Sequence, residues 1–490
     1  MNPETNRRIE YGDFQTPDAL AIQVCTRLAA DGVSPDVVIE PTCGLGAFVI
    51  AAASKFPDAA HICGYEINPE YLQILRERIS NIKEPTKYSV RQANFFTHGW
   101  QSDLDQLTGS ILVVGNFPWV TNAAQGLIGG NNLPEKSNFL NFSGFDAISG
   151  KANFDISEWM LIDVLRWLKG RHAHIAMLVK TAVARKVMAH AQRRQDSVSD
   201  AYIIQIDAKK NFAASVDACL LVINLDPEKD TCYDYTVYQD FNDKIGRRVG
   251  TRLGMVVRDL EAFNRHLDWL GTSDQKWRSG IKHDASSVME FIRSGGRYKN
   301  GLGEEVSLED RFLFPLLKGS DVGSDKTWRE KYVLVTQRHV GEQTNSIETQ
   351  APLTWSYLIK HANYLDGRGS TIYKKNPRFS IFGIGDYSFR PWRIAICALY
   401  KSLRFRLVGP IDGRPVMFDD TVYYVSFETE AEAVAAYSSL NSKPINALLE
   451  SLIFWDEKRP IKTSILNSVR WSPSTSVEPL LKLTRSSAAE

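Results

Sequence analysis

Short apolar runs alternate with helical patterns through the first half of the chain, and this alternation predicts the fold. Seven runs have the length and composition of strands, over residues 36–40, 61–67, 89–96, 109–119, 173–180, 201–208 and 216–225. Apolar residues at helical spacing predict helices over residues 46–56, 69–80 and 155–170. Strands separated by helices are typical of a mostly parallel sheet covered on both faces. Such a sheet binds its ligand beyond the carboxyl ends of its strands.

The alternation ends near Asp226, where the sequence becomes polar. The second half has few strand–helix repeats and no internal repeat, and it contains many aromatic and basic residues. We therefore predict four segments along the chain. They are a first domain over residues 1–230, a connecting segment over 231–275, a second domain of mixed strands and helices over 276–475, and a loosely ordered tail over 476–490.

The composition narrows the class of protein. The chain has 490 residues, of which 43% are hydrophobic and 23% are charged, as in a globular protein with a full core. Its formal net charge is +1, so any nucleic-acid-binding surface must be local. The N-terminus lacks the apolar core of a signal peptide, and no apolar run is long enough to span a bilayer. We expect a soluble cytoplasmic protein with no membrane partner.

The six cysteines are scattered along the chain and form no C-x-x-C pair. This spacing argues against a zinc site and against a disulfide framework, and it favours a reducing compartment. We therefore expect no metal ion.

The segment VIEPTCGLGAF, residues 38–48, carries the strongest chemical signal. A predicted buried strand ends at Glu40, and Gly44 and Gly46 then allow a tight turn into a helix. About twenty residues later the second strand ends at Glu66, and an acid at that spacing can accept hydrogen bonds from the two hydroxyls of a ribose. A G-x-G after a strand is also compatible with an ordinary strand-to-helix turn. The acid at the second strand end favours a nucleoside cofactor.

Two further features bear on which nucleoside is bound. The turn reads GLGAFV, so the third glycine of a dinucleotide-binding turn is missing. Glu40 would repel a phosphate, but its charge suits a cofactor that carries an ammonium and a sulfonium. These features favour S-adenosylmethionine over NAD.

The stretch VVGNFPWVTN, residues 113–122, places Phe117, Pro118 and Trp119 at the open end of a predicted strand. A loop at such a place normally favours small polar residues. One interpretation is a hydrophobic staple on the next element, because aromatic residues in loops commonly serve packing. The other is a site that must hold something flat.

Five segments now point to a family. QTPDALA, EPTCGLGAF, GYEIN, ANFF and GNFPW occur in the order used by gamma-class adenine-N6 DNA methyltransferases, which the first half of the chain resembles. The resemblance implies an α/β fold, with a Rossmann-like S-adenosylmethionine-dependent methyltransferase domain and a C-terminal mixed α+β target-recognition domain. It also implies S-adenosylmethionine as cofactor and double-stranded DNA as partner.

The resemblance implies roles around the cofactor. Residues 16–17 would lie over its methionine end, Glu40 and the turn at 43–46 would hold the amino acid, and Glu66 would hold the ribose. Asn94 and Phe95 would bound the adenine ring; the family usually has Asp in place of Asn94, but an Asn oxygen can still accept from the adenine amine. The implied cofactor-binding residues are Thr16, Pro17, Glu40, Cys43, Gly44, Gly46, Glu66, Ile67, Asn94, Phe95 and Asn116.

NFPW resembles the family's N-P-P-Y/F/W signature, which implies that Asn116, Phe117, Pro118 and Trp119 are catalytic. The exocyclic amine of adenine is a poor nucleophile because its lone pair is delocalised into the ring. If the Asn116 side-chain oxygen and the Phe117 carbonyl each accept one N–H, the nitrogen becomes more tetrahedral and more nucleophilic. Trp119 would stack on a flipped-out base. Phe212 either closes the sandwich from the other side or is a core residue beside a strand.

Phe117 is a departure from the family, which usually has proline there. The change keeps the backbone carbonyl but loses the rigid φ of proline. Similar N-L-P-Y and N-I-P-Y variants occur in rRNA adenine dimethyltransferases, so RNA stays open as an alternative substrate. A catalytically inactive module that binds S-adenosylmethionine and DNA is another alternative, against which Asn116, Pro118 and Trp119 count.

Segments of the second half, including FPLLKGSDV and FSIFGIGDYSFRPWRIAICALYKS, resemble the target-recognition region of type II restriction–modification methyltransferases. A basic region interleaved with aromatic residues would neutralise DNA phosphates there, or it is a solvated basic face. The implied DNA-binding residues are Lys374, Lys375, Arg378, Arg390, Arg393 and Lys401. No nuclease site is recognisable, which predicts a stand-alone modification enzyme with any restriction endonuclease on a separate chain.

Overall fold

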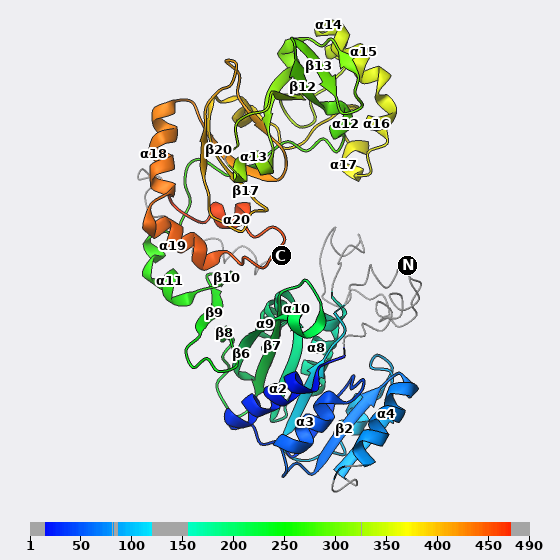
Figure 1. Cartoon of the computed structure of the whole chain (residues 1–490). Helices are drawn as coiled ribbons and strands as arrows, with labels where there is room; N and C mark the ends of the chain where they lie inside the picture. Colours follow the sequence, from blue (N-terminus) through cyan, green and yellow to red (C-terminus); the bar gives the residue numbers. More distant parts are fainter. Residues whose placement is uncertain (1–14, 81, 83–86, 120–154, 325, 472–490) are drawn as a thin grey trace. The chain divides into compact units, whose positions relative to one another are not determined.

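The computed structural model describes residues 15–80, 82, 87–119, 155–324 and 326–471. The chain divides into two compact units, Met1–Arg252 and Leu253–Glu490 (Figure 1). The predicted tail over 476–490 lies outside the described residues. No helix in the described part of the chain is long and apolar enough to cross a membrane.

The chain forms a ten-stranded sheet with the order β10-β9-β8-β6-β7-β5-β4-β1-β2-β3. Its strands are β1 Val37–Glu40, β2 His61–Glu66, β3 Tyr88–Gln92, β4 Ile111–Asn116, β5 Ala173–Lys180, β6 Val198–Ile206, β7 Ala218–Leu225, β8 Tyr235–Tyr238, β9 Arg247–Arg252 and β10 Met255–Val257. Strands β1 to β9 lie in the first unit, and β10 follows the boundary at Arg252. Strands β3, β2, β1, β4 and β5 run parallel, whereas β7 is antiparallel to both β5 and β6. All seven strands expected from the apolar runs are confirmed.

Helices cover the sheet of the first unit, as Figure 1 shows. They are α2 Asp18–Ala30, α3 Ala47–Lys55, α4 Pro69–Ser80, α5 Trp100–Leu104, α8 Ile156–Trp167, α9 Thr181–Arg194 and α10 Ala208–Phe212. Helix α2 packs on α3, and α8 packs on α9. Buried side chains of α2 and α3 form one apolar core with β1, β4 and β5, because these helices each turn an apolar face to the sheet.

The direction of the chain changes at β1. This strand has β2 on one side and β4 on the other, so the chain leaves β1 toward one edge of the sheet and later returns to extend the other edge. A crevice at the carboxyl ends of the strands forms at such a switch point. The turn after β1 and the NFPW segment after β4 therefore start at the same edge, beside each other.

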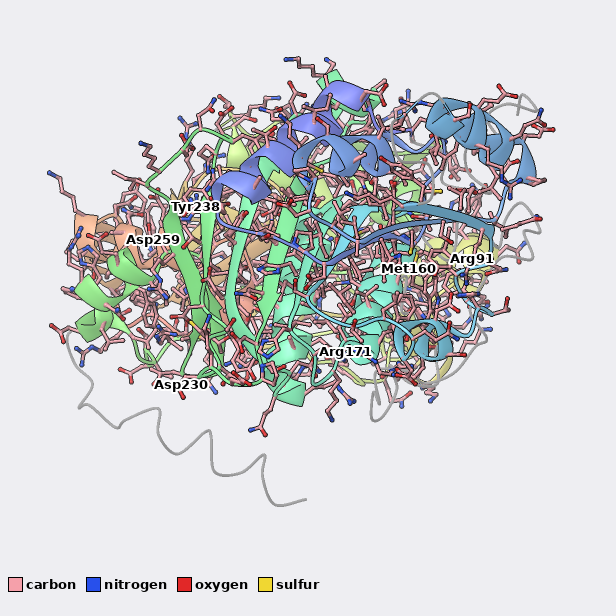
Figure 2. The ribbon with its side chains drawn as sticks, turned by 90° about the horizontal axis from the view of Figure 1, so that it is seen from below. Arg91, Met160, Arg171, Asp230, Tyr238 and Asp259 are labelled. Atoms are coloured by element: carbon pink, nitrogen blue, oxygen red, sulfur yellow. The ribbon has the colours of Figure 1, made fainter. Side chains whose placement is uncertain are left out.

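The expected connecting segment over 231–275 is wrong in its first part. Strand β8 pairs in parallel with β6, and β9 pairs with β8, so the first unit continues to Arg252. The Tyr238 ring, labelled in Figure 2, lies 5.9 Å from that of Tyr202, and the Arg27 guanidinium lies 5.0 Å from its centroid. The polar stretch after Asp226 is a loop that returns the chain to the sheet.

The second unit contains two sheets, a four-stranded one that is antiparallel throughout and a six-stranded one in which only β15 and β19 pair in parallel. The four-stranded sheet has the order β11-β20-β17-β18, and the six-stranded sheet has the order β14-β13-β12-β16-β15-β19. Their strands are β11 Arg278–Ser279, β12 Glu290–Ser294, β13 Arg297–Asn300, β14 Glu305–Val306, β15 Leu313–Leu317, β16 Lys331–Leu334, β17 Trp392–Cys397, β18 Arg406–Val408, β19 Met417–Phe418 and β20 Val422–Phe427. This combination of strands and helices confirms the expected mixed class of the second half.

Short helices and two longer ones accompany these sheets. They are α11 Leu260–Arg265, α12 Ser286–Met289, α13 Gly319–Gly323, α14 Ile347–Gln350, α15 Pro352–Lys360, α16 Ala362–Asp366, α17 Thr371–Lys374, α18 Glu430–Leu440, α19 Lys443–Leu452 and α20 Thr463–Leu466. Helix α18 begins with a capping box, in which Thr429 and Glu432 satisfy each other's backbone N–H groups. Helices α18 and α19 pack on each other in Figure 1 and share an apolar core with β17 and β20.

Candidate functional site

The turn after β1 depends on two glycines in the left-handed region. Gly44 has φ +50° and Gly46 has φ +83°, a backbone conformation that glycine adopts without steric cost. A Cβ on Gly46 would lie 2.1 Å from Leu75 Cδ1, so the α4 side chain leaves room for hydrogen alone. Gln15 Oε1 accepts the Leu45 N–H at 3.1 Å, which brings the segment with Thr16 and Pro17 to the turn.

Glu66 ties the end of β2 to this turn. One carboxylate oxygen accepts the Gly44 N–H at 2.8 Å, and the other accepts the Asn68 N–H at 2.9 Å. Ile67 lies between these two contacts in the chain and is half-buried. A carboxylate offers about four acceptor sites, so these two bonds are compatible with a ligand that also donates to Glu66. The side chain has a structural task that the sequence did not indicate.

Glu40 lies beneath the turn, and its residue is only 3% exposed. Its Oε2 accepts the Val49 N–H at 2.9 Å, inside the first turns of α3. Burial raises the pKa of the Glu40 carboxyl well above its usual value, while the hydrogen bond from Val49 opposes that shift. Direct contact of Glu40 with a ligand amine stays a prediction.

The segment after β3 contributes Asn94 and Phe95. Asn94 Oδ1 accepts the Phe96 N–H at 2.9 Å, which closes a local turn. The buried Phe95 ring meets the Phe117 ring edge to face, with centroids 5.5 Å apart. The structure thus brings Phe95 against the NFPW segment, whereas contact of Asn94 with a ligand stays a prediction.

NFPW follows directly from β4. Asn116 is the last residue of the strand, and it lies beside Leu178 in the register with β5. Thr42 Oγ1, in the turn that contains Cys43, donates to the Asn116 carbonyl at 3.3 Å. Phe117 is buried at 1% exposure, and Pro118 is half-buried. The two sequence signals therefore form one site.

Trp119 and Phe212 touch each other. Their ring centroids are 4.8 Å apart at an interplanar angle of 68°, and both residues are buried. A base fits between two rings only if they lie about 7 Å apart, since stacked rings are separated by van der Waals contact on each side. The expected sandwich is therefore not formed in this conformation, and base entry requires Trp119 and Phe212 to separate.

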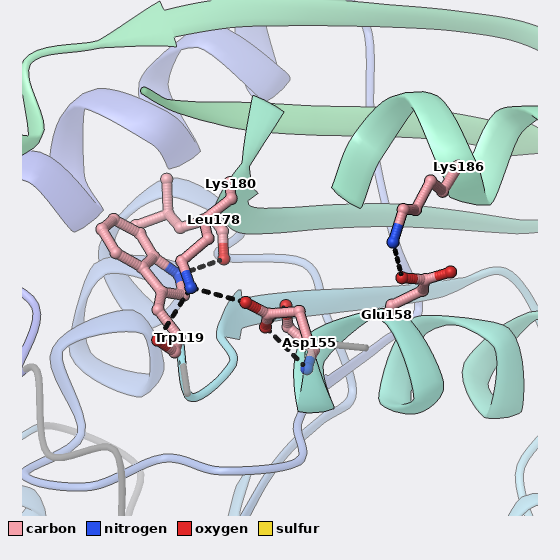
Figure 3. A network of polar contacts seen from close by, with 7 residues as sticks. Trp119, Asp155, Glu158, Leu178, Lys180 and Lys186 are labelled. Carbon is pink, nitrogen blue, oxygen red and sulfur yellow. Dashed lines mark hydrogen bonds and ion pairs between the residues drawn. The ribbon is translucent and has the colours of Figure 1, made fainter. Parts of the chain in front are cut away.

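Lys180 and Asp155 belong to the site and were not expected there. Lys180, the last residue of β5, donates from Nζ to the Trp119 carbonyl at 3.0 Å and to Asp155 Oδ2 at 2.6 Å (Figure 3). Asp155 also caps α8, where its Oδ1 accepts the Ser157 N–H. A signal was present, because Lys180 ends a buried strand at the same edge as NFPW, but the partner of its charge is set by tertiary structure.

Comparison with curated proteins decides the family. The chain is 47% identical over 464 residues to the type II methyltransferase M.NspV of Nostoc sp. (strain ATCC 29411 / PCC 7524). The matched region covers 94% of this chain and 96% of that protein. The chain belongs to the type II methyltransferases. No protein-family model matches it. Among solved structures, the type IIL restriction-modification enzyme MmeI in complex with DNA has a similar fold, with a TM-score of 0.55, 11% identity, and coverage of 95% of this chain and 69% of that one.

The cofactor of this methyltransferase is S-adenosylmethionine. Its first unit has the Rossmann-like fold of S-adenosylmethionine-dependent methyltransferases. The site fits that group, because side chains are absent at Gly44 and Gly46 and a carboxylate stands at the end of β2. In the part of the chain that the structure describes, no three His, Cys, Asp or Glu residues are grouped as metal ligands.

The six residues expected to bind DNA differ in their exposure and in their contacts. Lys374, Lys375 and Lys401 are exposed. Arg378 and Arg390 are ion-paired, with Asp366 at 2.7 Å and Glu428 at 2.9 Å respectively.

Arg393 is a correction to this set. It is fully buried, its guanidinium donates to the Ser388 carbonyl, and burial lowers its pKa to about 10. A side chain without accessible surface does not contact a phosphate, so its predicted DNA contact is wrong in this structure. It is a core residue of β17 that holds the segment before the strand.

Proposed function

We propose that this type II methyltransferase transfers the methyl group of S-adenosylmethionine to the N6 amine of adenine at a specific site in double-stranded DNA. One observation carries the proposal. Asn116, Phe117, Pro118 and Trp119 leave β4 next to the glycine turn of β1, and Thr42 joins the two segments by a hydrogen bond. A methyl acceptor held by NFPW and a cofactor held by the turn would therefore be neighbours.

The cofactor pocket is proposed from the residues around the turn. Glu66 would accept the ribose hydroxyls, and the Cys43–Gly46 turn with residues 16–17 would hold the amino-acid end. Phe95, packed against Phe117, would bound the adenine ring next to Asn94. When bound, S-adenosylmethionine supplies an electrophilic methyl group on a positively charged sulfur.

Asn116 would activate the target amine. Its side-chain oxygen and the Phe117 carbonyl accept the two N–H groups, which withdraws the nitrogen lone pair from the ring and turns it toward the methyl group. The nitrogen forms the new N–C bond as the S–C bond breaks, the electron pair of that bond stays on sulfur, and the nitrogen then loses a proton to water. Acceptors fixed before the reaction stabilise the positive charge that develops on nitrogen.

Duplex DNA is proposed as the substrate because of the family and of the second unit. A paired base cannot reach a buried methyl donor, so the target adenine would swing out and stack on Trp119. Exposed lysines of the second unit, Lys374, Lys375 and Lys401, would neutralise phosphates and set the position of the duplex. MmeI, whose fold is similar, was solved in complex with DNA. A restriction endonuclease for the same site would be a separate chain.

The test is Asn116→Ala. Loss of one acceptor should lower the single-turnover rate of methyl transfer by about two to three orders of magnitude, as for removal of one preorganised electrostatic partner. Binding of S-adenosylmethionine, measured by calorimetry, should stay at the wild-type level. Asn211→Ala is the matched control, because Asn211 donates within α10 to the Asp207 carbonyl and lies one residue from Phe212. Wild-type rates for Asn116→Ala would refute the proposal.

A further inference from the structure

Strand β5 holds Trp119 at two points. The indole Nε1–H donates to the Leu178 carbonyl at 3.3 Å, and Lys180 Nζ donates to the Trp119 carbonyl at 3.0 Å. Figure 3 shows both bonds, which come from the last three residues of the strand. One bond fixes the ring, and the other fixes the backbone from which the ring projects.

Asp155 fixes the ammonium group of Lys180 in turn. The two side chains are 23% and 8% exposed, and their charged atoms are 2.6 Å apart. A charge-assisted bond that is largely withdrawn from water is stronger than the same pair at the surface. Because Asp155 is also the N-cap of α8, the rigid start of that helix is linked through Lys180 to Trp119.

We propose that Lys180 and Asp155 are positioning residues for the target-base subsite, where they set the location of the Trp119 backbone. The inference rests on the proposed role of Trp119 as a stacking platform. In the parallel register of β4 and β5, Asn116 lies beside Leu178, so Lys180, two residues further along β5, reaches the last residue of NFPW. Its donor thereby meets the residue that follows the catalytic Asn116, Phe117 and Pro118.

The contact between Trp119 and Phe212 explains why a backbone anchor is useful. Base entry requires the two rings to separate, which breaks their contact and strains the indole bond to Leu178. The Lys180 bond is made to the carbonyl, so it can persist while the indole rotates about its side-chain bonds. The ring then moves about a fixed point and stacks on the base in one orientation.

A purely structural role for the ion pair is the competing explanation. Lys180 directly precedes α9 and Asp155 directly precedes α8, and a second ion pair between these two helices offers a comparison. Lys186 of α9 pairs with Glu158 of α8 at 2.7 Å, and this second ion pair already joins the helices (Figure 3). Asp155 caps α8 through Ser157 without help from Lys180. Packing and capping therefore do not account for the bond from Lys180 to Trp119.

The first experiment reads the Trp119 environment without DNA. The full chain is labelled with fluorotryptophan, and the Trp119 resonance is assigned by its loss in Trp119→Phe. Lys180→Met should shift or broaden that resonance, whereas Lys180→Arg, which keeps a charged donor, and the matched control Lys186→Met should leave it in place. An unchanged resonance in Lys180→Met overturns the proposal, whatever base the enzyme methylates.

The second experiment reads capture of the base. A duplex carries 2-aminopurine at the methylated position, located beforehand by sequencing, and its fluorescence reports the flipped base. Lys180→Met should weaken this signal or raise the KM for DNA by roughly tenfold, the loss expected for one charge-assisted hydrogen bond. Cofactor affinity should not change, and Lys180→Arg should restore most of the signal.

The outcomes separate the two proposals. A lower melting temperature for Lys180→Met, with wild-type resonance and base capture, makes the ion pair structural and overturns the positioning role. A shifted Trp119 resonance in an enzyme that methylates no adenine supports the positioning role and contradicts the proposed function. If Lys180→Met fails to fold, Asp155→Asn removes the charge while keeping the N-cap acceptor, and wild-type behaviour of that variant overturns the proposal.

Discussion

At the scale of single residues, Glu40 is a carboxyl group placed in the interior of the first unit. Its pKa is raised in the folded protein because burial disfavours the charged form. Between the unfolded pKa of about 4.3 and the raised folded pKa, the unfolded chain releases a proton that the folded chain keeps. The contribution of Glu40 to stability is therefore complete below the unfolded pKa and is lost as the pH rises through the folded pKa.

Glu40→Gln should remove this dependence on pH. The amide keeps an oxygen for the Val49 N–H but has no charge to bury. The melting temperature of the variant relative to wild type should therefore be higher at about pH 8 than at about pH 5. Glu70→Gln, at an exposed position in the first turn of α4, is the control and should show an equal difference at both pH values. A relative melting temperature that falls with rising pH would contradict the account.

Single residues also show where sequence reasoning was sufficient. The positions of Gly44, Gly46 and Glu66 were predictable because a short-range turn and a fixed interval between strand ends determine them, whereas their contacts with the cofactor stay predictions. The burial of Arg393 was missed, although the residue stands in the apolar run of β17 next to the buried Ile394, a context that favours burial. Contact between Trp119 and Phe212 depends on how distant elements pack, which no local pattern specifies.

At the scale of elements, two constraints at the start of α3 require glycine at position 46. Gly46 has a positive φ, and its missing side chain faces Leu75, which is fully buried in α4. A methyl group there meets two penalties, because an L-residue is strained at that φ and the leucine has no space to retreat.

Gly46→Ala should therefore destabilise the protein more than a glycine-to-alanine change at a position where only the positive φ is unfavourable. Gly170→Ala is the matched control, since Gly170 has φ +77° with nothing within 4 Å of the added Cβ. The free energy of unfolding in urea should fall by about 1–3 kcal/mol more for Gly46→Ala than for Gly170→Ala, the cost of overpacking alone. An equal decrease in the free energy of unfolding for the two variants would show that contact with Leu75 is not what requires glycine at position 46.

The helices and strands differ in how well the sequence predicts them. The seven predicted strands are confirmed because continuous apolar runs bounded by polar residues leave few alternatives. Helix α9 was missed, although Val183, Val187 and Ala191 lie on one buried face at helical spacing. Its many alanines and basic residues weaken the apolar contrast on which the interpretation relied. Strands β8 and β9 were missed because the polar loop before them was interpreted as a domain boundary.

At the scale of the whole molecule, the second unit is proposed to hold the duplex through its exposed lysines. Lys374→Ala with Lys375→Ala should weaken DNA binding and reduce the slope of log affinity against log salt by about two, since each phosphate contact contributes about 0.9. The matched control replaces Arg297 and Lys360, two exposed basic residues of the same unit that are not among the expected DNA-binding residues and that pair with Glu305 and Glu304. Titrations at several salt concentrations decide the matter, and equal slopes for both double variants would make Lys374 and Lys375 a solvated face.

The fold class and the cofactor of the protein could be predicted from its sequence, whereas the DNA sequence that it recognises could not. Ordered motifs placed on strand ends predicted a Rossmann-like S-adenosylmethionine-dependent methyltransferase, which the sheet topology and the type II relative confirm. No such regularity governs the second unit, where the two sheets are built from distant segments and the sequence read by the protein depends on side chains at the DNA.

The most direct test of the proposed function identifies the methylated nucleoside. The protein is incubated with methyl-labelled S-adenosylmethionine and with duplex DNA or RNA in parallel, and the nucleic acid is digested and analysed by mass spectrometry. The account predicts label in N6-methyladenine from duplex DNA, and its loss in Asn116→Ala. Label found only in cytosine, only in RNA, or in no nucleoside would contradict it.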